Sequence, residues 1–322
     1  MTASGPQWIW DRLHRLRGRF LEDVAAHCAT DYWHDDRDLE AYDAVLAPRI
    51  GWKLEAVLVE LATRGASLVG GTLLDWGCGT GIAARTCAGP LGATRVLLHD
   101  RSPRAMAFAA ARSTAALPGV PITTVADPHS VDPDLLLVSH ALGELSAVGL
   151  DALLAIAQRS AQIVWVEAGS RTIARRLSEV RDRLLRDPWT VQLPCPHQGP
   201  CGALQAGEEH WCHGFASPPP EVFQDPFWRA AAQQLGIDLR ALPYHYLVMT
   251  RSPAPCIAPQ RRLLGRADVR NKLARCYVCD HTGLHHETIH KSTQPQLYRQ
   301  LKKQLPPWLV DLGAVPPADP DS

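Results

Sequence analysis

The stretch LLDWGCGTG, at residues 73–81, joins a short apolar run to a glycine-rich turn. The run ends in Asp75, and glycines follow at the alternate positions Gly77, Gly79 and Gly81. Glycine lets the backbone turn tightly and approach a ligand, because no Cβ stands in the way. A helix that begins after Gly81 would also present free backbone N–H groups there. The stretch therefore predicts a strand, a ligand-binding loop and a helix.

Five short apolar runs lie between residues 72 and 169, and helix-like segments separate them. They are TLLDWG, RVLLHD, ITTVAD, DLLLVSHAL and QIVWVEAG. Buried strands that alternate with helices are typical of a parallel sheet covered on both faces. With right-handed crossovers, the pattern predicts an α/β, Rossmann-like, doubly wound domain.

The length of 322 residues suggests a core domain and an accessory region. We expect an N-terminal helical segment at 1–68, in which aromatic residues such as Tyr32 and Trp33 serve packing. The Rossmann-like core follows at 69–187. A Cys-rich region at 188–305 would contain a helix at 221–235, a strand at HYLVMTR and a hairpin with its turn at DHTG. Residues 306–322 predict a flexible tail.

Composition narrows the classes of function. The 33 basic and 33 acidic residues balance, so the chain as a whole is not a polycation made for nucleic acid. No apolar run reaches 18 residues, and the N-terminus lacks the order of a signal peptide. We therefore expect a cytoplasmic protein without membrane contact. In that reducing environment, clustered cysteines more often bind metal than form disulfides.

The glycine loop does not meet the dinucleotide fingerprint, because its spacing is G-x-G-x-G. Asp100 ends the next strand, at the place where an acid grips a ribose hydroxyl pair. This arrangement resembles class I S-adenosylmethionine-dependent methyltransferases. A tight turn without a ligand, or an enzyme of another nucleotide, remains an alternative interpretation.

The methyltransferase resemblance implies a cofactor site at the ends of the predicted strands. The loop would lie under the methionine and ribose, Asp100 would bind the ribose hydroxyls and Asp127 would face the adenine. Ser139-His140 would mark the methyl-acceptor side. The cofactor-binding residues expected in this way are Asp75, Gly77, Cys78, Gly79, Gly81, Asp100, Asp127 and Ser139.

The catalytic residues remain unknown at this stage. VSHALGEL, after the fourth strand, lacks the Asn/Asp-Pro-Pro-aromatic motif common in amino-group methyltransferases. The dipeptide Pro200-Cys201, which cytosine-C5 enzymes use as a nucleophile, falls beyond the fifth strand. Glu144 and Glu167 could orient the acceptor or fix loops, and the sequence does not separate these roles.

Three cysteines crowd into LPCPHQGPCGALQAGEEHWCH, residues 193–213, where we predict no helix or strand. They are Cys195, Cys201 and Cys212, while Cys276 and Cys279 form a C-x-x-C pair far downstream. Thiolates are soft ligands, typical of iron–sulfur clusters and zinc. Zinc sites usually take two close pairs of ligands, whereas a 4Fe–4S cluster suits wider spacing. Spacing alone leaves a cluster, zinc and unligated cysteines open.

The cysteine pattern carries a second resemblance. CPHQGPC followed by WCH, and later CDHTG, resemble the signature of the mitochondrial small-ribosomal-subunit assembly family, whose members are methyltransferase-like and have bacterial relatives. VSHALGEL, VEAGS and the closing KS…LYR…W pattern resemble it too, over roughly residues 40–312. The resemblance implies a 4Fe–4S cluster on Cys195, Cys201, Cys212 and Cys279, with Cys276 as the alternative fourth ligand and zinc as the alternative metal.

Other residues near the cysteines receive weaker assignments. His197, His210 and His213 could be alternative ligands, but we expect them at the surface or as donors to the sulfurs. Cys256 is a weaker ligand candidate, and Cys28 is expected to be buried and inert.

Two basic runs flank the cysteines. Residues 261–303 hold 10 Lys and Arg against 3 Asp and Glu, and a helix at 171–186 is rich in arginine. Such clusters neutralise phosphates, and aromatic residues such as Tyr277 and Tyr298 could stack on bases. The family resemblance and these runs predict small-subunit ribosomal RNA, or the assembling small subunit, as the partner of a monomer.

Two hypotheses therefore stand. The first is an S-adenosylmethionine-binding methyltransferase with a 4Fe–4S cluster that acts on small-subunit ribosomal RNA. The second is a non-catalytic assembly factor that uses the same fold to hold RNA. A zinc-stabilised methyltransferase of another substrate is a third candidate.

Overall fold

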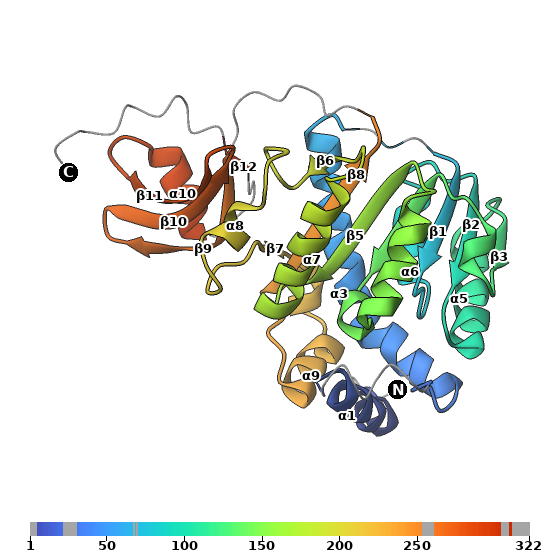
Figure 1. The fold of residues 1–322 in the computed structure, drawn as a ribbon. Coiled ribbons are helices and arrows are strands. Elements are labelled where there is room, and N and C mark those ends of the chain that lie inside the picture. The colour runs from blue at the N-terminus through green and yellow to red at the C-terminus, as the bar shows by residue number, and fades with distance from the viewer. Residues whose placement is uncertain are drawn as a thin grey trace.

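The chain folds around two β-sheets (Figure 1). The computed structural model describes residues 5–21, 31–66, 68, 70–252, 261–303 and 309–310. Within them, the larger sheet has the strand order β3-β2-β1-β4-β5-β8-β6, with β7 paired to β8. The second sheet has the order β11-β10-β9-β12. Cys28, Cys256 and Trp308 lie outside the described residues.

All five apolar runs form strands of the larger sheet, which confirms the Rossmann-like α/β prediction. They are β1 (Thr72–Trp76), β2 (Arg95–His99), β3 (Ile122–Thr124), β4 (Leu135–Ser139) and β5 (Gln162–Ala168). These strands are parallel, and their order reverses between β1 and β4. Ligands of doubly wound sheets bind outside the carboxyl ends of the strands at such a switch point.

Antiparallel strands extend the far edge of this sheet. β8 (Leu242–Thr250), predicted from HYLVMTR, lies between β5 and β6 (Thr190–Leu193), and β7 (Gly214–Ala216) pairs with one end of it. The segment after the Rossmann core thus returns to complete the main sheet.

Helices cover both faces of the sheet. Successive residues of a strand point to opposite faces, so neighbouring residues of β1 contact different helices. Leu73 faces the cluster formed with α3 (Asp36–Thr63), α4 (Ile82–Cys87) and α5 (Pro103–Ala116). Leu74 faces the cluster formed with α6 (Ala147–Ala157) and α7 (Arg171–Leu184). Figure 1 shows α3 behind the sheet and α6 and α7 in front of it. α1 (Gln7–Leu21) and α9 (Pro226–Leu235) pack together near the start of α3.

The second sheet contains the predicted hairpin. Its strands are β9 (Arg261–Arg270), β10 (Leu273–Asp280), β11 (Gly283–His290) and β12 (Leu309–Val310). β10 and β11 pair in antiparallel fashion up to Asp280 and Gly283, which confirms the turn at DHTG. α10 (Pro295–Lys303) covers one face, where Tyr298 packs with Leu263 and Val278.

The structure corrects two local predictions. The cysteine stretch is not irregular throughout, since β6 ends at Leu193 and α8 (Gly202–Gln205) forms a short turn of helix. β6 exists because it pairs with β8, more than fifty residues later, which no local pattern reveals. The helix expected at 221–235 is interrupted: η3 (Pro220–Phe223) ends, and α9 starts anew at Pro226 after the cap residue Asp225. Proline lacks the N–H that a continuing helix would need.

Among the described helices, none is both long and apolar enough to cross a membrane.

Candidate functional site

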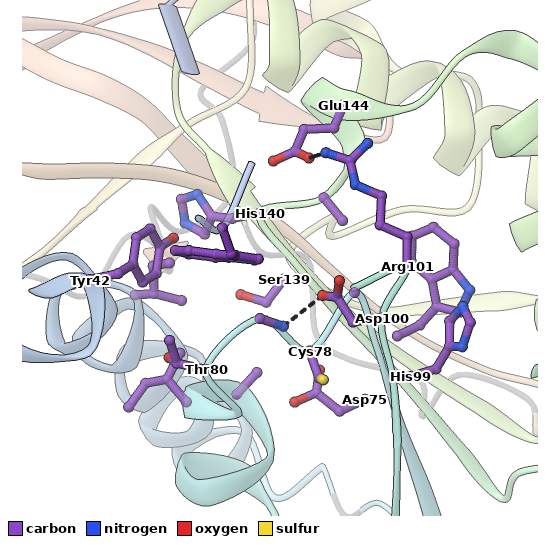
Figure 2. A pocket seen from close by; sticks show the side chains of 18 of the residues that line it. Tyr42, Asp75, Cys78, Thr80, His99, Asp100, Arg101, Ser139, His140 and Glu144 are labelled. Carbon is purple, nitrogen blue, oxygen red and sulfur yellow. Dashed lines mark hydrogen bonds and ion pairs between the residues drawn. The ribbon is translucent and has the colours of Figure 1, made fainter. Parts of the chain in front are cut away.

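A cavity lies at the switch point of the larger sheet (Figure 2). The glycine loop and the ends of β2 and β4 form its floor. Asp75, Cys78, Asp100, Ser139 and His140 all line it, as Figure 2 shows. Residues far apart in the sequence therefore meet where a doubly wound sheet binds its ligand.

Backbone hydrogen bonds hold the glycine loop against the end of β2. The N–H groups of Gly77 and Cys78 donate to the His99 carbonyl, at 2.8 and 2.9 Å. The carboxylate of Asp100 accepts from the N–H of Gly79 at 2.9 Å and, through its other oxygen, from Ser102 at 2.9 Å. Asp100 thus ties the loop after β1 to the start of α5.

Asp75 is a buried carboxyl group with one oxygen free for a ligand. Its Oδ2 accepts from the Ala84 N–H at 3.0 Å, whereas its Oδ1 is buried without a hydrogen-bond partner in the described part of the chain. Burial raises the pKa of Asp75 to about 7. A cationic ligand group in the cavity would satisfy the free oxygen and favour the ionised carboxylate.

The three loop glycines have different reasons for being glycine. All have positive φ, which other residues rarely adopt. A Cβ on Gly79 would meet no atom within 4 Å, so this position is open toward the cavity that Gly79 lines. A Cβ on Gly81 would come within 2.9 Å of Ser113 Oγ, so Gly81 permits the close packing of α4 on α5.

Two of the predicted cofactor residues lie outside the cavity lining, namely Gly81 and Asp127. The Asp127 side chain is exposed and accepts from the His129 N–H at 2.9 Å, as the cap of η1 (Pro128–Ser130). The adenine contact of Asp127 stays a prediction beside this capping contact. The other predicted residues all line the cavity: Asp75, Gly77, Cys78, Gly79, Asp100 and Ser139.

Three aromatic side chains form one wall of the cavity. Sequence reasoning assigned Tyr32 and Trp33 to packing and did not single out Tyr42. Tyr32, Trp33 and Tyr42 line the cavity. The Trp33 ring lies 4.7 Å from Tyr32 and 5.4 Å from Tyr42, between centroids. The spacing of the loop glycines does not indicate which segment of the chain packs over them. No local signal could therefore identify these aromatic residues.

Arg101 and Glu144 close one side of the cavity. Arg101 pairs with the Glu144 carboxylate at 3.3 Å and lies over the Tyr32 ring, 5.1 Å from its centroid. The Tyr32 hydroxyl also donates to Glu144, at 3.5 Å. Glu144, at the end of η2 (Leu142–Glu144), thus connects the N-terminal segment to the loop after β4.

Glu167 fixes the turn after β4. Its Oε1 accepts hydrogen bonds from the N–H groups of Ala141 and Leu142, at 3.1 and 2.9 Å, and from Trp165 Nε1 at 2.8 Å. Burial raises the pKa of Glu167 to about 7, against the opposing effect of these donors and of Lys53.

The predicted metal ligands line a second, smaller cavity. Cys195, Cys201, Cys212 and Cys279 all line it, together with His197. Burial first, and then the neighbouring thiols, raise the pKa of Cys279. The structure therefore brings the four cysteines named by the family signature to one place, although more than sixty residues separate the third from the fourth.

Cys276 lies elsewhere. Its side chain is on the α10 side of the second sheet, among Ala274 and Val278, and its thiol donates to the Glu287 carbonyl at 3.9 Å. Positions 276 and 279 point to opposite faces of β10, because side chains alternate along a strand. Cys279 is thus the member of the C-x-x-C pair that faces the cavity.

Two buried arginines border the cysteine cavity. Sequence reasoning placed both in the basic runs expected to face phosphates and did not connect them with the cysteines. Arg181 Nε donates to Cys195 Sγ at 3.1 Å. Burial raises the pKa of Cys212 to about 12, and the nearby Arg262 opposes this rise. His197 Nε2 lies 3.6 Å from Cys279 Sγ. His210 and His213 do not line the cavity and instead contact the rings of Tyr277 and Trp211.

Across the described residues, no three His, Cys, Asp or Glu side chains lie in a group that could hold a single metal ion. The four cysteines line one cavity, but no three of the described ones form such a group.

Comparison with known proteins decides the family. A model of the family described as mitochondrial small ribosomal subunit Rsm22 matches residues 38–308. The chain belongs to the Rsm22 family. Membership confirms the resemblance drawn from the cysteine signature and links the chain to proteins of the small ribosomal subunit. No curated protein matches the chain.

Solved structures similar to this Rsm22 family member carry methyltransferase names. A putative RNA methyltransferase from Pyrococcus horikoshii is 13% identical over 61% of this chain and 80% of its own, with a TM-score of 0.39. The magnesium protoporphyrin IX methyltransferase of Synechocystis PCC 6803 is 13% identical over 76% and 99%, with a TM-score of 0.40. The plantazolicin methyltransferase is 15% identical over 76% and 99%, with a TM-score of 0.42. At these scores, the likenesses say nothing about cofactor or substrate here.

Proposed function

We propose that this Rsm22 family member binds S-adenosylmethionine and acts as a methyltransferase on small-subunit ribosomal RNA, or on the assembling small subunit. The observation that carries the proposal is the switch-point cavity, where the glycine loop meets the buried Asp75 and the partly buried Asp100. The free oxygen of Asp75 suits the ammonium group of the cofactor, and Asp100 lies where the ribose hydroxyls would bind. Gly77, Cys78, Gly79 and Ser139 would complete the cofactor site.

The second sheet supports RNA as the substrate. Its face opposite α10 is partly open, and there the exposed Tyr277 ring lies 4.3 Å from the His286 ring and 4.9 Å from the His210 ring, between centroids. Arg275 is exposed on the same face. Aromatic rings that stack on unpaired bases, beside arginines that neutralise phosphates, are typical of single-stranded RNA binding.

RNA binding is tested with a fluorescent single-stranded RNA oligonucleotide in an anisotropy titration. We expect Tyr277→Ala to weaken binding by about tenfold, because stacking contributes about 1–3 kcal/mol per base. Tyr277→Phe should retain most of the affinity. Phe223→Ala removes another exposed aromatic ring, from η3, and serves as the control. Equal affinity of the Tyr277→Ala and wild-type proteins would contradict the stacking role.

We also propose that the cysteine cavity holds a 4Fe–4S cluster on Cys195, Cys201, Cys212 and Cys279. Thiolates around one zinc ion, at about 2.3 Å each, must converge closely. A multi-iron cluster takes thiolates from several directions, which suits four cysteines that line one cavity from two distant parts of the chain. The guanidinium groups of Arg181 and Arg262 would offset the negative charge of a cluster held by four thiolates. Its role would be to cross-link the loop after β6 to β10.

The enzymatic proposal is tested by incubating the purified protein with radiolabelled S-adenosylmethionine and small subunits from cells that lack it. Label in the ribosomal RNA is the expected result. Cofactor binding without transfer would favour the second hypothesis, a non-catalytic assembly factor. The missing acceptor motif in VSHALGEL also supports that hypothesis. A cytoplasmic location and a monomeric state remain predictions.

A further inference from the structure

His140 has an unusual backbone conformation at the edge of the cofactor cavity. Its φ of 54° is the one positive value at a non-glycine residue in the described ranges. Such a conformation costs of order 1–3 kcal/mol and persists where the surroundings enforce it. Here the His140 N–H donates to the Val166 carbonyl at 2.9 Å, and Glu167 holds the next two N–H groups. The enforced turn places His140 in the cavity lining.

Lys53 is in contact with the His140 ring. It is 8% exposed, comes from the middle of α3, and its Nζ is 3.2 Å from His140 Nε2. The residue type is unexpected, because only five of the 33 basic residues are lysines and Lys53 is the single lysine before residue 272. Lysine, unlike arginine, can lose its proton when buried.

The pair is next to the place where the methyl donor would lie. A Cβ on Gly77 would come 3.3 Å from Ala141 Cβ, so the turn after β4 packs against the glycine loop. Ser139, one residue before His140, has a buried hydroxyl with no hydrogen-bond partner among the described residues. Because Nε2 of His140 faces Lys53, Nδ1 is the ring nitrogen left for a ligand beside this hydroxyl.

The charges around the pair favour neutral forms. Burial, and then Arg49, lower the pKa of Lys53 to about 7, while Glu167 opposes this. Burial, then Lys53 and Arg49, hold the pKa of His140 well below its usual range. The charged or titratable groups that face the pair are thus Arg49 on α3 and Glu167 on β5. Above about pH 7, an uncharged amine faces an uncharged imidazole.

We propose that His140 and Lys53 form a proton relay that deprotonates an N–H group of a nucleobase during methyl transfer. The inference rests on the proposed methyltransferase function and specifies a nitrogen acceptor. The acceptor nitrogen bonds to the methyl group while the carbon–sulfur bond breaks, and its electron pair stays on sulfur. The proton of that nitrogen moves to Nδ1 of His140, and the proton on Nε2 moves to Nζ of Lys53. Imidazole remains neutral in its other tautomer, and Lys53 becomes an ammonium.

The relay has a signature that needs no activity. In the full-length protein labelled with ¹³C-lysine and ¹⁵N-histidine, NMR should show Lys53 titrating near pH 7, far below exposed lysines at about 10.4. Over the same pH range, His140 should switch from the Nδ1–H to the Nε2–H tautomer. A His140 tautomer that stays constant, or a Lys53 pKa near 10, would overturn the relay, because a purely structural hydrogen bond needs no exchange.

Activity on small subunits supplies the second test. We expect wild-type transfer to rise between pH 6 and 8, and Lys53→Arg, which stays protonated, to lose about 100-fold. Lys53→Met should lose as much, and both should bind S-adenosylhomocysteine like wild type, which shows that the site is folded. Full activity of both variants would overturn the relay. Absence of transfer by the wild type, with the tautomer switch present, would overturn the methyltransferase assignment and leave the proton exchange standing.

Discussion

Single residues at and near the glycine loop have different roles: some hold the loop in place, and others face the ligand cavity. Asp100 spends both carboxylate oxygens on backbone N–H groups, whereas Asp75 keeps one oxygen free. Gly81 is needed for helix packing, and Gly79 faces the open cavity. Sequence spacing places three of them at the glycine loop and Asp100 just after β2, but their different contacts depend on how α4 and α5 pack there.

The role of Gly79 is tested by Gly79→Ala, with Gly119→Ala as its control. Both glycines have positive φ, and a Cβ on either meets no atom within 4 Å. Both substitutions should therefore cost about 1 kcal/mol of unfolding free energy. Gly79→Ala alone should weaken S-adenosylhomocysteine binding, by tenfold or more, in calorimetry. Equal affinity of the two variants would show that the ligand does not approach Gly79.

The buried Asp75 should make stability depend on pH. Its folded-state pKa of about 7 exceeds the ordinary value of 3.8, so between these values the folded state binds more protons than the unfolded state. This contribution to stability is present below pH 4 and is lost as the pH rises to about 7. Asp75→Asn should thus exceed wild type by about 2 kcal/mol at pH 8 in denaturant unfolding, and by little at pH 4. A gap that does not change with pH would contradict this account.

Helix α3 and strand β10 each contribute side chains to more than one site. α3 contributes Tyr42 to the cavity wall, Lys53 to the pair with His140 and Glu60 to an ion pair with the second sheet. β10 separates its side chains by face, with Cys276 toward α10 and Cys279 toward the cysteine cavity. The periodicity of each element is visible in its own sequence, but the residues that each face contacts come from distant parts of the chain.

The face alternation of β10 predicts different effects of its two cysteines. Cys279→Ser should abolish the cluster, and Cys276→Ser should retain it, because only Cys279 lines the cavity among the described residues of this strand. Iron and sulfide content and the absorption spectrum after anaerobic purification measure the difference. Loss of iron in Cys276→Ser with retention in Cys279→Ser would reverse the assignment, and stoichiometric zinc without iron would remove it.

At the scale of the whole molecule, a buried polar junction connects the two sheets. Arg262 of β9 is 1% exposed, pairs with Glu60 of α3 at 3.6 Å and lies over the Tyr246 ring of β8. The Tyr246 hydroxyl donates to the same Glu60. The cysteine cavity borders this junction, so a cluster there would reinforce the contact between the sheets.

Removal of the Arg262 charge should weaken the whole fold. Arg262→Met leaves Glu60 buried without its cation, which costs about 3–5 kcal/mol for buried pairs. Arg240→Met removes an exposed partner of Asp238 and should cost less than about 1 kcal/mol. Denaturant unfolding of the metal-free, full-length proteins compares the two. A similar, small loss in both would show that the junction carries little stability.

The prediction from sequence succeeded where the signal is local. The five strands, the glycine loop and the DHTG turn follow from periodicity and turn chemistry over a few residues. It failed at β6, which exists through pairing with β8. The adenine contact of Asp127 stays a prediction; among the described residues this side chain caps η1.

The sequence by itself determined the fold class, the position of the glycine loop and the family, because strand–helix alternation and the cysteine signature are written in consecutive residues. Tertiary structure decided which groups meet. Lys53 reaches His140 across 87 positions, and Arg262 reaches Glu60 from the other sheet. Such contacts arise when helices and strands bury their apolar faces, and the polar groups carried along must then find partners that no local pattern specifies.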